Sequence, residues 1–464
     1  MTLSALSETL RRREISSVEA TAACLEAIAR HDGAINSFVS VESDDALACA
    51  TRCDQDIAAG RWRGPLHGVP LAHKDMFYRA GKVSSCGSAL CRDRVATTTA
   101  TVHDRLRAAG AVHVGNLNMS EFAAGPTGHN SHFGHCRNPW NPAHVSGGSS
   151  SGSAAAVAGR LTFASLGSDT GGSIRLPAAM CGVVGLKPTY GLISRFGVMP
   201  RSWSLDVVGP LARTAEDSAL LLQAVAGHDP KDGTTAAHPP PDYCAALRGD
   251  LRGLHIGIPT NATFGEVDPD VRSQLEVSVR ALENLGARIE PVRLPDPHVI
   301  YALTNLVNKA EAATIHARWV RTRRDEYSLS TVNRFEAGFH IPATHYLDAL
   351  RLRARLLTDF ITRVFNNVDA VHLPVIGIPV PTIEETEIRS TAAVPELMER
   401  ITRYTRWVNY LGLPALSVPC GFTPSGLPAA FQLLGRPFSE ARLLRIAHAY
   451  QQVTDWHRRE PPRH

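Results

Sequence analysis

The sequence contains a serine-rich stretch whose residue types could support nucleophilic catalysis. Within "HVSGGSSSGSAAAVAG" at 144–159, the run GSSSG at 148–152 matches the G-x-S-x-G pattern of hydrolases in which the central serine attacks the substrate. That chemistry requires a buried strand that runs directly into the serine. The preceding segment, "NPWNPAHVS", contains two prolines, which are excluded from a central strand. We therefore expect Ser150 to be a bystander and not the nucleophile.

A second stretch, "LGSDTGGSIRLP" at 166–177, offers a different serine. Its D-T-G at 169–171 matches the aspartic proteases, but those enzymes need two carboxylates that share a proton, and the chain has a single copy of the motif. Consecutive glycines before Ser173 allow successive backbone N–H groups to point at one place, which is one way that proteins bind an oxyanion. Ser173 is therefore the stronger candidate nucleophile.

A nucleophilic serine needs a base, and the composition singles out Lys74. Only five of the 48 lysines and arginines are lysines, and Lys74 lies in the apolar segment "GVPLAHKDMF". Arginine cannot lose its proton in a protein, whereas a desolvated lysine can become a neutral amine base. Two alternatives stay open: Lys74 pairs with Asp75 at the surface, or one of the 20 histidines is a distant base.

These motifs, together with "YLGLPALSVPCG" near the C-terminus, closely resemble the amidase signature family, and the resemblance covers nearly the whole chain. It implies a Ser, cis-Ser, Lys triad, in which Ser173 is the nucleophile, Ser149 is the bridging serine after a cis peptide bond, and Lys74 is the base. It implies an oxyanion hole built from the backbone N–H groups of Thr170, Gly171, Gly172 and Ser173. It implies no metal and no cofactor.

Three details of the motifs need interpretation. Ser151-Gly152 stands where the family usually has a second pair of glycines. His73 occupies a place that is often apolar, and because neighbouring side chains on a strand point to opposite faces, we expect it to be structural. Arg175 matches the family's "GSIR", and we expect it to fix the loop by bonding Asp169 or the backbone.

The resemblance implies a serine hydrolase that works through an acyl-enzyme and cleaves carbon–nitrogen acyl bonds other than peptide bonds, in amides and also in carbamates. Esters, cleaved at the acyl carbon–oxygen bond, are a further substrate class that it implies. The alternative is the glutaminase subunit of a tRNA-dependent amidotransferase. Two segments, "TAAVPELMERITRYTRWV" and "HLPVIGIPVP", argue against it, because we expect that subunit to have different residues there. The intact set of Lys74, Ser149 and Ser173 argues against a third class, a binding protein that kept the fold. By analogy the substrate contacts four residues that could equally belong to the core: Phe122, Gly125, Thr127 and Trp203.

The elements that must position these residues indicate an α/β fold. An apolar strand around Lys74 is followed by a helix in "TVHDRLRAAG" and a strand in "AVHVGN", and the same order returns in "GLHIGIP", "DPDVRSQLEVSVRALENLG" and "ARIEPV". Such alternation predicts right-handed crossovers and parallel strands. We therefore expect the amidase signature fold, a large, twisted, mixed and mostly parallel β-sheet between layers of α-helices.

The chain is expected to form a single domain over 1–464. Residues 1–60 are predicted to form two amphipathic helices, with Ser17 as a helix cap, and 61–226 to hold the catalytic motifs. The Pro- and Gly-rich segment at 227–250 is predicted to be a surface connection. The remainder of the sheet, further helices and the substrate pocket are expected within 251–464.

The composition is that of a soluble globular protein, with 44% hydrophobic and 20% charged residues. A net charge of +4, evenly spread, does not indicate a nucleic-acid partner. Because the sequence shows no run of about 18 apolar residues and no secretory signal, we expect no membrane association and a cytoplasmic location. The nine scattered cysteines favour buried thiols in a reducing compartment. We expect a small amide-type substrate as the partner and leave a homodimer open.

Overall fold

The computed structural model describes residues 1–247, 250–261, 266–387 and 394–463, and the chain folds around two β-sheets. The smaller sheet has the strand order β1-β3-β2. Its strands are β1 (Phe38–Val41), β2 (Pro70–Lys74) and β3 (Val112–Leu117). Strands β2 and β3 are parallel and are joined through helix α4 (Thr101–Ala108), as the sequence predicts, whereas β1 is antiparallel to β3.

The larger sheet has eight strands in the order β4-β6-β5-β10-β11-β9-β7-β8. Their bounds are β4 (Ala164–Asp169), β5 (Val184–Lys187), β6 (Val207–Ala212), β7 (His255–Pro259), β8 (Arg288–Val292), β9 (Ala370–Pro374), β10 (Ala415–Phe422) and β11 (Pro428–Leu434). The predicted parallel pair β7–β8 is confirmed, and it is joined through α9 (Pro269–Asn284), which begins at the Asp268 cap.

A mixed sheet between helices is confirmed, but the prediction that it is mostly parallel is wrong. Every neighbouring pair from β4 to β9 is antiparallel, and only β9–β7 and β7–β8 are parallel. The prediction extended to the whole sheet what holds for two strand–helix–strand units, β2–α4–β3 and β7–α9–β8, whose strands are indeed parallel. The other strands meet as a hairpin, as β10 and β11 do, or come together from distant parts of the chain, and neither arrangement requires a parallel crossover.

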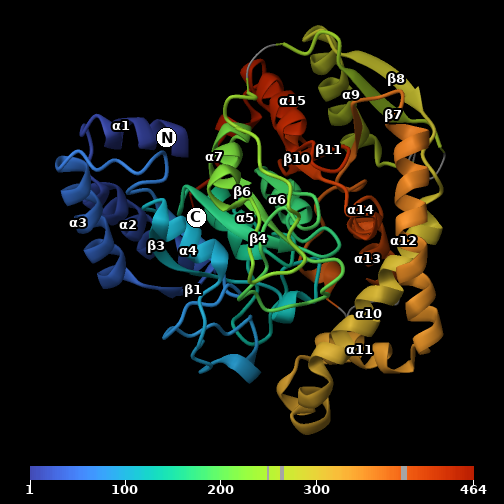
Figure 1. Ribbon diagram of the computed structural model, residues 1–464, viewed down its shortest axis with the longest axis horizontal. Helices are drawn as coiled ribbons and strands as arrows, with labels where there is room; N and C mark the ends of the chain where they lie inside the picture. Colours follow the sequence, from blue (N-terminus) through green and yellow to red (C-terminus); the bar gives the residue numbers. More distant parts are fainter. Residues whose placement is uncertain (248–249, 262–265, 388–393, 464) are drawn as a thin grey trace.

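The N-terminal region contains three helices where two were predicted, and they lie together on one side of the molecule (Figure 1). Ser16, and not Ser17, caps the second helix, because its side chain accepts the N–H of Glu19 while the Glu19 carboxylate accepts the N–H of Ser16. This reciprocal pair is a capping box. The three helices are α1 (Leu3–Arg11), α2 (Ser17–Ile35) and α3 (Ser43–Ala58).

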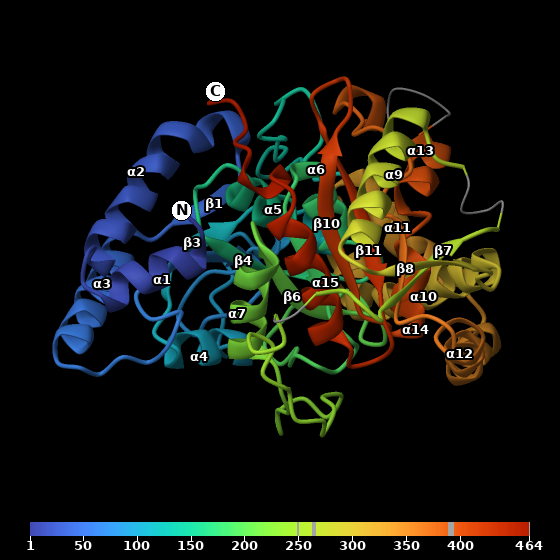
Figure 2. The same cartoon turned by 90° about the horizontal axis from the view of Figure 1, so that it is seen from above.

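Two groups of helices pack on the large sheet and hold the motif segments. Helices α5 (Ser151–Ala158) and α6 (Arg175–Cys181) follow the two serine motifs directly, and α6 packs on β5, β10 and β11. Helices α7 (Ala215–Val225) and α15 (Glu440–Gln452) pack on each other and on β6 and β10. Figure 2 shows β10, β11 and these helices in the centre, between the N-terminal helices and α12.

A further helical layer, which the sequence motifs do not predict, covers the far side of the molecule (Figure 1). Its members are α10 (Pro297–Thr322), α11 (Leu329–Glu336), α12 (Ala343–Val364), α13 (Val394–Thr402) and α14 (Arg406–Leu411). Short 3-10 helices are η1 (Ala89–Cys91), η2 (Glu121–Ala123), η3 (Arg324–Glu326), η4 (Ala337–His340), η5 (Glu384–Thr386) and η6 (Trp456–Arg458). None of the helices that the structure describes combines the length and the apolar character needed to cross a membrane.

The predicted connection at 227–250 has no helix or strand within its described part, 227–247 and 250, and most of these residues are at least partly exposed. It is anchored by a few buried side chains, among them Asp229 and Tyr243. All nine cysteines are free thiols, and seven of them are buried.

Candidate active site

Lys74 is the last residue of β2, and its side chain is buried among hydroxyl groups. Its Nζ lies 2.8 Å from Ser149 Oγ, 3.0 Å from Ser150 Oγ and 2.9 Å from Ser168 Oγ. The alternative of a surface pair with Asp75 is wrong, because Asp75 is itself buried and accepts the backbone N–H of Ser85 at 2.9 Å. Lys74 has no ion pair among the described residues.

Burial lowers the pKa of Lys74 to about 7, although the charges of Asp169 and Asp206 oppose the shift. Removing an ammonium group from water disfavours its charged form, and no carboxylate lies close enough to compensate. A substantial fraction of Lys74 is therefore a neutral amine near pH 7, as a general base must be.

Ser149 lies where the motif bends sharply toward Lys74. The Gly148–Ser149 peptide bond is cis, as the resemblance implies. Gly147 adopts φ +78°, and a Cβ at this position would come within 2.6 Å of the Pro177 backbone, so only glycine fits. The Ser149 carbonyl accepts the backbone N–H of Ser120 at 3.1 Å, which fixes the segment against the loop after β3.

Ser150, which is expected to be a bystander to the attack, lies beside the lysine. Ser150 Oγ contacts Lys74 Nζ, donates to the Ser168 carbonyl at 3.2 Å and accepts the Ser168 N–H at 3.2 Å. Sequence reasoning also missed Ser168 as a partner of Lys74. Its position in the motif, one residue before Asp169, is the signal that could have placed it beside the lysine.

Ser173 lies between the end of β4 and the start of α6, and it is partly exposed, whereas Ser149 and Lys74 are fully buried. Its carbonyl accepts the backbone N–H of Ser150 at 3.2 Å, so the two serine motifs are joined directly. Within the described chain the Ser173 hydroxyl makes no hydrogen bond, including none to Ser149. The exposed hydroxyl is therefore available to a substrate, and the buried pair lies behind it.

The glycine turn before Ser173 is organised by the carboxylate of Asp169. Asp169 Oδ1 accepts the N–H of Gly172 at 2.7 Å, so the predicted place of Gly172 in the oxyanion hole is contradicted, because its N–H points at the carboxylate. The N–H groups of Thr170, Gly171 and Ser173 make no hydrogen bond within the described part of the chain. These three donors are the ones that an oxyanion could use.

Arg175 fixes this turn, as predicted. Its Nε and Nη2 lie 3.1 and 3.2 Å from the two carboxylate oxygens of Asp169, and both side chains are fully buried. Asn409 donates to the same carboxylate at 2.9 Å. Because the positive charge of Arg175 favours the ionised carboxyl, the pKa of Asp169 lies well below its usual range despite burial. The negative charge of Asp169 is therefore balanced by Arg175 within the protein itself.

The four predicted substrate contacts occupy different environments. The Phe122 ring is buried in an aromatic cluster and lies 4.6 Å from the His316 ring, and Thr127 is also buried. The Gly125 carbonyl lies next to Gly148, close to the motif. Trp203 is 40% exposed and lines a cavity of about 270 Å³ together with Ser168 and Asp206.

His73 points to the face of β2 opposite Lys74, where its Nδ1 accepts the N–H of Leu166 at 3.0 Å. With His103, which is buried, and His113, which is partly buried, it forms a cluster whose ligand atoms lie within 4.8 Å of one another. Such a set could approach a metal only after rearrangement, because nitrogens around a tetrahedral zinc lie about 3.3 Å apart. Burial lowers the pKa of His73 to about 3, so its ring is neutral.

The chain matches known proteins over almost its whole length. Residues 19–444 match the Amidase family. The chain is 43% identical over 484 residues to a glutamyl-tRNA(Gln) amidotransferase subunit from Methylococcus capsulatus, covering 99% of this chain and 98% of that protein.

Two solved structures resemble the whole fold. One belongs to a vestigial protein complex described as revealing the evolutionary origins of an s-triazine catabolic enzyme, with a TM-score of 0.91, 34% identity and coverage of 97% and 98% of the two chains. The other is the peptide amidase of Stenotrophomonas maltophilia, with a TM-score of 0.86, 30% identity and coverage of 100% and 98%. The chain therefore belongs to the amidase signature family of amidohydrolases, which act on carbon–nitrogen bonds.

Proposed function

We propose that the protein hydrolyses carbon–nitrogen acyl bonds by using Ser173 as the nucleophile, Ser149 as a proton relay and Lys74 as the base. The observation that carries this proposal is the 2.8 Å contact between Lys74 Nζ and Ser149 Oγ in a fully buried site. Neutral Lys74 takes the proton of Ser149 while Ser149 takes that of Ser173, whose oxygen attacks the substrate carbonyl.

The hydroxyl protons around Lys74 support Ser149 as the relay. Ser150 donates its proton to the Ser168 carbonyl, and the Ser168 hydroxyl points at the Met76 sulfur, 3.1 Å away. Ser149 Oγ has no hydrogen bond in the described residues other than that to Lys74. Of the three hydroxyls, that of Ser149 is therefore the one whose proton is free to move to the amine.

The remaining steps use the N–H groups beside Ser173 and the same relay. The tetrahedral oxyanion accepts hydrogen bonds from the free N–H groups of Thr170, Gly171 and Ser173, each worth about 3 kcal/mol of barrier in comparable sites. Protonated Lys74 returns its proton through Ser149 to the leaving nitrogen, and the carbon–nitrogen bond breaks to give an acyl-enzyme on Ser173. Water, activated by the same relay, then cleaves the ester.

A fluorophosphonate probe, which reacts with activated serines, tests this assignment. We expect the parent protein to be labelled on Ser173, and the Ser173→Ala variant to remain unlabelled. The Lys74→Arg variant should be labelled very slowly, since a guanidinium cannot accept the proton. Labelling of Ser173→Ala at the parent rate would show that the nucleophile is wrong, and an unreactive parent protein would favour a binding protein that kept the fold.

Two physiological roles are compatible with this chemistry. The 43% identity over nearly the full length of a protein named as an amidotransferase subunit supports the glutaminase-subunit role more than the stand-alone hydrolase, which the peptide amidase likeness supports at 30% identity. Ammonia release from glutamine, measured with and without co-expressed partner proteins, separates them. Robust release that depends on a partner would exclude the stand-alone role, and partner-independent hydrolysis of simple amides would exclude the other.

A further inference from the structure

Hydrogen bonds fix most of the peptide groups in the glycine turn at 169–173. In three of them the carbonyl oxygen accepts a hydrogen bond from elsewhere in the chain. The pairs are Asp169 with the Asn409 side chain at 2.9 Å, Gly171 with the Thr405 hydroxyl at 2.9 Å, and Gly172 with the Leu176 N–H at 2.7 Å. Because a peptide group is planar, a bond to its carbonyl also fixes the direction of its N–H.

The peptide group between Thr170 and Gly171 lacks such a bond. Within the described residues, neither the Thr170 carbonyl nor the Gly171 N–H has a hydrogen-bond partner. The Gly171 N–H is nevertheless one of the three donors proposed for the oxyanion, so its direction matters for the proposed reaction. The side chain of Thr170 supplies the bond that the backbone does not.

Asp206 holds this side chain from the neighbouring strand. The Thr170 hydroxyl donates to Asp206 Oδ1 at 2.6 Å, and both residues are buried. Strands β4 and β6 are antiparallel with Asp169 opposite Val207, so the register places Thr170 opposite Asp206, one step beyond the last pair. The side-chain bond therefore continues the pairing after the two strands have ended, and a charged acceptor makes such a bond strong.

The Asp206 carboxylate is itself held in one orientation. Its other oxygen accepts the backbone N–H groups of Arg201 and Ser202 at 2.8 Å each. The Asp206 N–H donates to the Ser202 carbonyl at 2.9 Å, so the residue closes a tight turn immediately before β6. No cation forms an ion pair with Asp206 in the part of the chain that the structure describes. Three hydrogen bonds thus make this carboxylate a fixed point for Thr170.

Asp206 also influences Lys74 through its charge. The ionisable groups close enough to affect the pKa of Lys74 are Asp169, Asp206 and the Cys86 thiol. Asp169 is paired with Arg175, and burial keeps the pKa of Cys86 well above its usual value, so that thiol is neutral. Burial lowers the pKa of Lys74, and the unpaired charge of Asp206 opposes this by favouring the ammonium form.

We propose that Asp206 is a positioning residue of the reaction, which fixes the Thr170–Gly171 peptide group through the Thr170 hydroxyl so that the Gly171 N–H points at the oxyanion. This inference rests on the proposed function, because it assigns a role in the same reaction. Asp206 acts through Thr170 and not on the reacting atoms. The oxyanion forms only as the reaction proceeds, so the contact contributes to the rate constant and not to binding of the ground state.

Labelling of Ser173 by a fluorophosphonate probe measures this contribution without a known substrate. The Ser173 oxygen forms a bond to phosphorus while fluoride leaves, and the hydroxyl proton passes through Ser149 to Lys74. The phosphoryl oxygen gains negative charge where the oxyanion of an amide would form. The dependence of the labelling rate on probe concentration gives the affinity constant KI and the rate constant kinact separately.

Thr170→Val removes the hydroxyl and keeps the shape of the side chain. It should lower kinact roughly 10- to 100-fold and change KI less than about threefold, because an oxyanion donor loses its direction. Thr170→Ser restores the hydroxyl and should recover most of the lost rate. The matched control is Thr101→Val, because the Thr101 hydroxyl also donates to a buried carboxylate at 2.6 Å, that of Asp229, and contacts neither serine motif. This control should leave both constants unchanged.

Asp206→Asn tests the same side chain through its charge. An amide can still bond Thr170 and the turn, but the negative charge that favours the Lys74 ammonium is gone. The midpoint of the labelling rate against pH should therefore move to lower pH than in the parent protein. Thr170→Val keeps the charge and should keep the midpoint.

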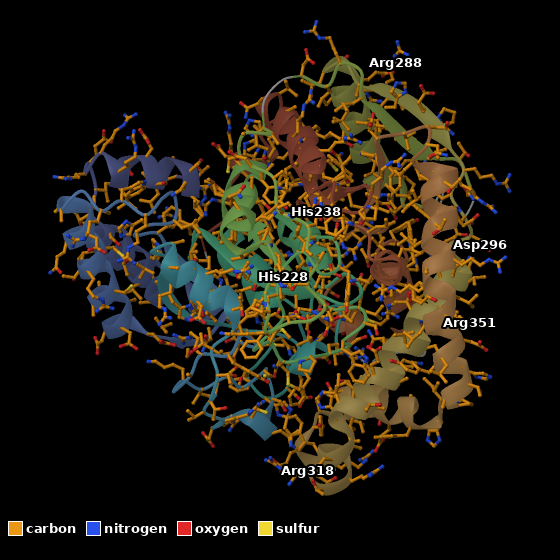
Figure 3. The ribbon with its side chains drawn as sticks, viewed as in Figure 1. His228, His238, Arg288, Asp296, Arg318 and Arg351 are labelled. Carbon is orange, nitrogen blue, oxygen red and sulfur yellow. The ribbon has the colours of Figure 1, made fainter. Side chains whose placement is uncertain are left out.

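The control for the loss of charge is Asp296→Asn. Asp296 is exposed at the start of α10, at the periphery of the molecule (Figure 3), where asparagine caps a helix as well as aspartate does. This variant should change neither the midpoint nor kinact.

The outcomes separate this inference from the function on which it rests. If Ser173 is not labelled in the parent protein, the proposed function fails. If Ser173 is labelled and Thr170→Val keeps the parent kinact, or Thr170→Ser is as slow as Thr170→Val, the positioning role is refuted. A rise in KI as large as the fall in kinact would also refute it, since Thr170 would then shape the binding site. An unchanged midpoint in Asp206→Asn would refute the effect of its charge on Lys74. Thr170→Ala takes the place of Thr170→Val if that variant does not fold.

Discussion

The protonation of Lys74 predicts how activity depends on pH. The proposed relay needs the neutral amine, so we expect activity to rise as the pH rises through the pKa of Lys74, which burial lowers to about 7. For a single group of that pKa the neutral fraction is about 9% at pH 6, about half at pH 7 and about 91% at pH 8. We therefore expect kcat/KM to increase about tenfold between pH 6 and pH 8 and to reach a plateau above it.

The assay is fluorophosphonate labelling or amide hydrolysis at low substrate, followed from pH 5 to 9 at constant ionic strength. Lys187 needs a control because burial also lowers its pKa to about 7, but its Nζ donates to the Pro188 carbonyl and does not contact the serines. Lys187→Met should therefore keep the midpoint, and Lys74→Arg should remove the activity at every pH. A bell-shaped pH profile centred near pH 6, or a midpoint that shifts in the Lys187→Met variant, would refute the reasoning.

Three further changes test the arrangement around the base and the turn. Ser149→Ala should lower kcat/KM about 10²- to 10⁴-fold as a lost proton relay. Ser150→Ala also loses its two bonds to the Ser168 backbone, but it removes only one of the three hydroxyl contacts of Lys74, so kcat/KM should fall by about 1 kcal/mol or fivefold; equal losses would contradict the separate roles. Arg175→Met should cost about 3–5 kcal/mol in urea unfolding, because Asp169 remains buried and charged, and a loss below 1 kcal/mol would argue against that charge. Gly147→Ala should lower Tm, since its Cβ would meet the α6 backbone at φ +78°; an unchanged Tm would contradict this.

Much of the site could be predicted because the motifs are local. The glycines before Ser173 indicate backbone N–H groups that can point at one place. The rare lysine in an apolar strand indicates a base that can lose its proton. The helix signals around Asp268 and Pro269 were equally local, and the observed α9 begins where they indicate. These features depend on neighbours in the sequence, which a single chain displays.

The rest depends on contacts between distant segments. The direction of the strand pairs could not be inferred for β10 and β5, which lie far apart in the sequence and meet in an antiparallel register, Ala415 opposite Lys187. The contacts of Lys74 with Ser150 and Ser168 likewise join strand β2 to segments that lie 76 and 94 residues later in the chain.

The carboxylate of Asp169 also bears on when the protein can become active during its synthesis. The Asp169 carboxylate accepts the N–H of Gly172 from its own turn. It also accepts a hydrogen bond from the side-chain amide of Asn409, which lies 240 residues later in the chain. At translation rates of about 5–20 residues per second, that separation corresponds to about 12–48 s on the ribosome. A nascent chain that already carries Ser173 therefore lacks part of the support of the glycine turn before it until α14 has emerged. The carboxylate that organises the glycine turn is therefore fully held only after the segment around Asn409 has been synthesised.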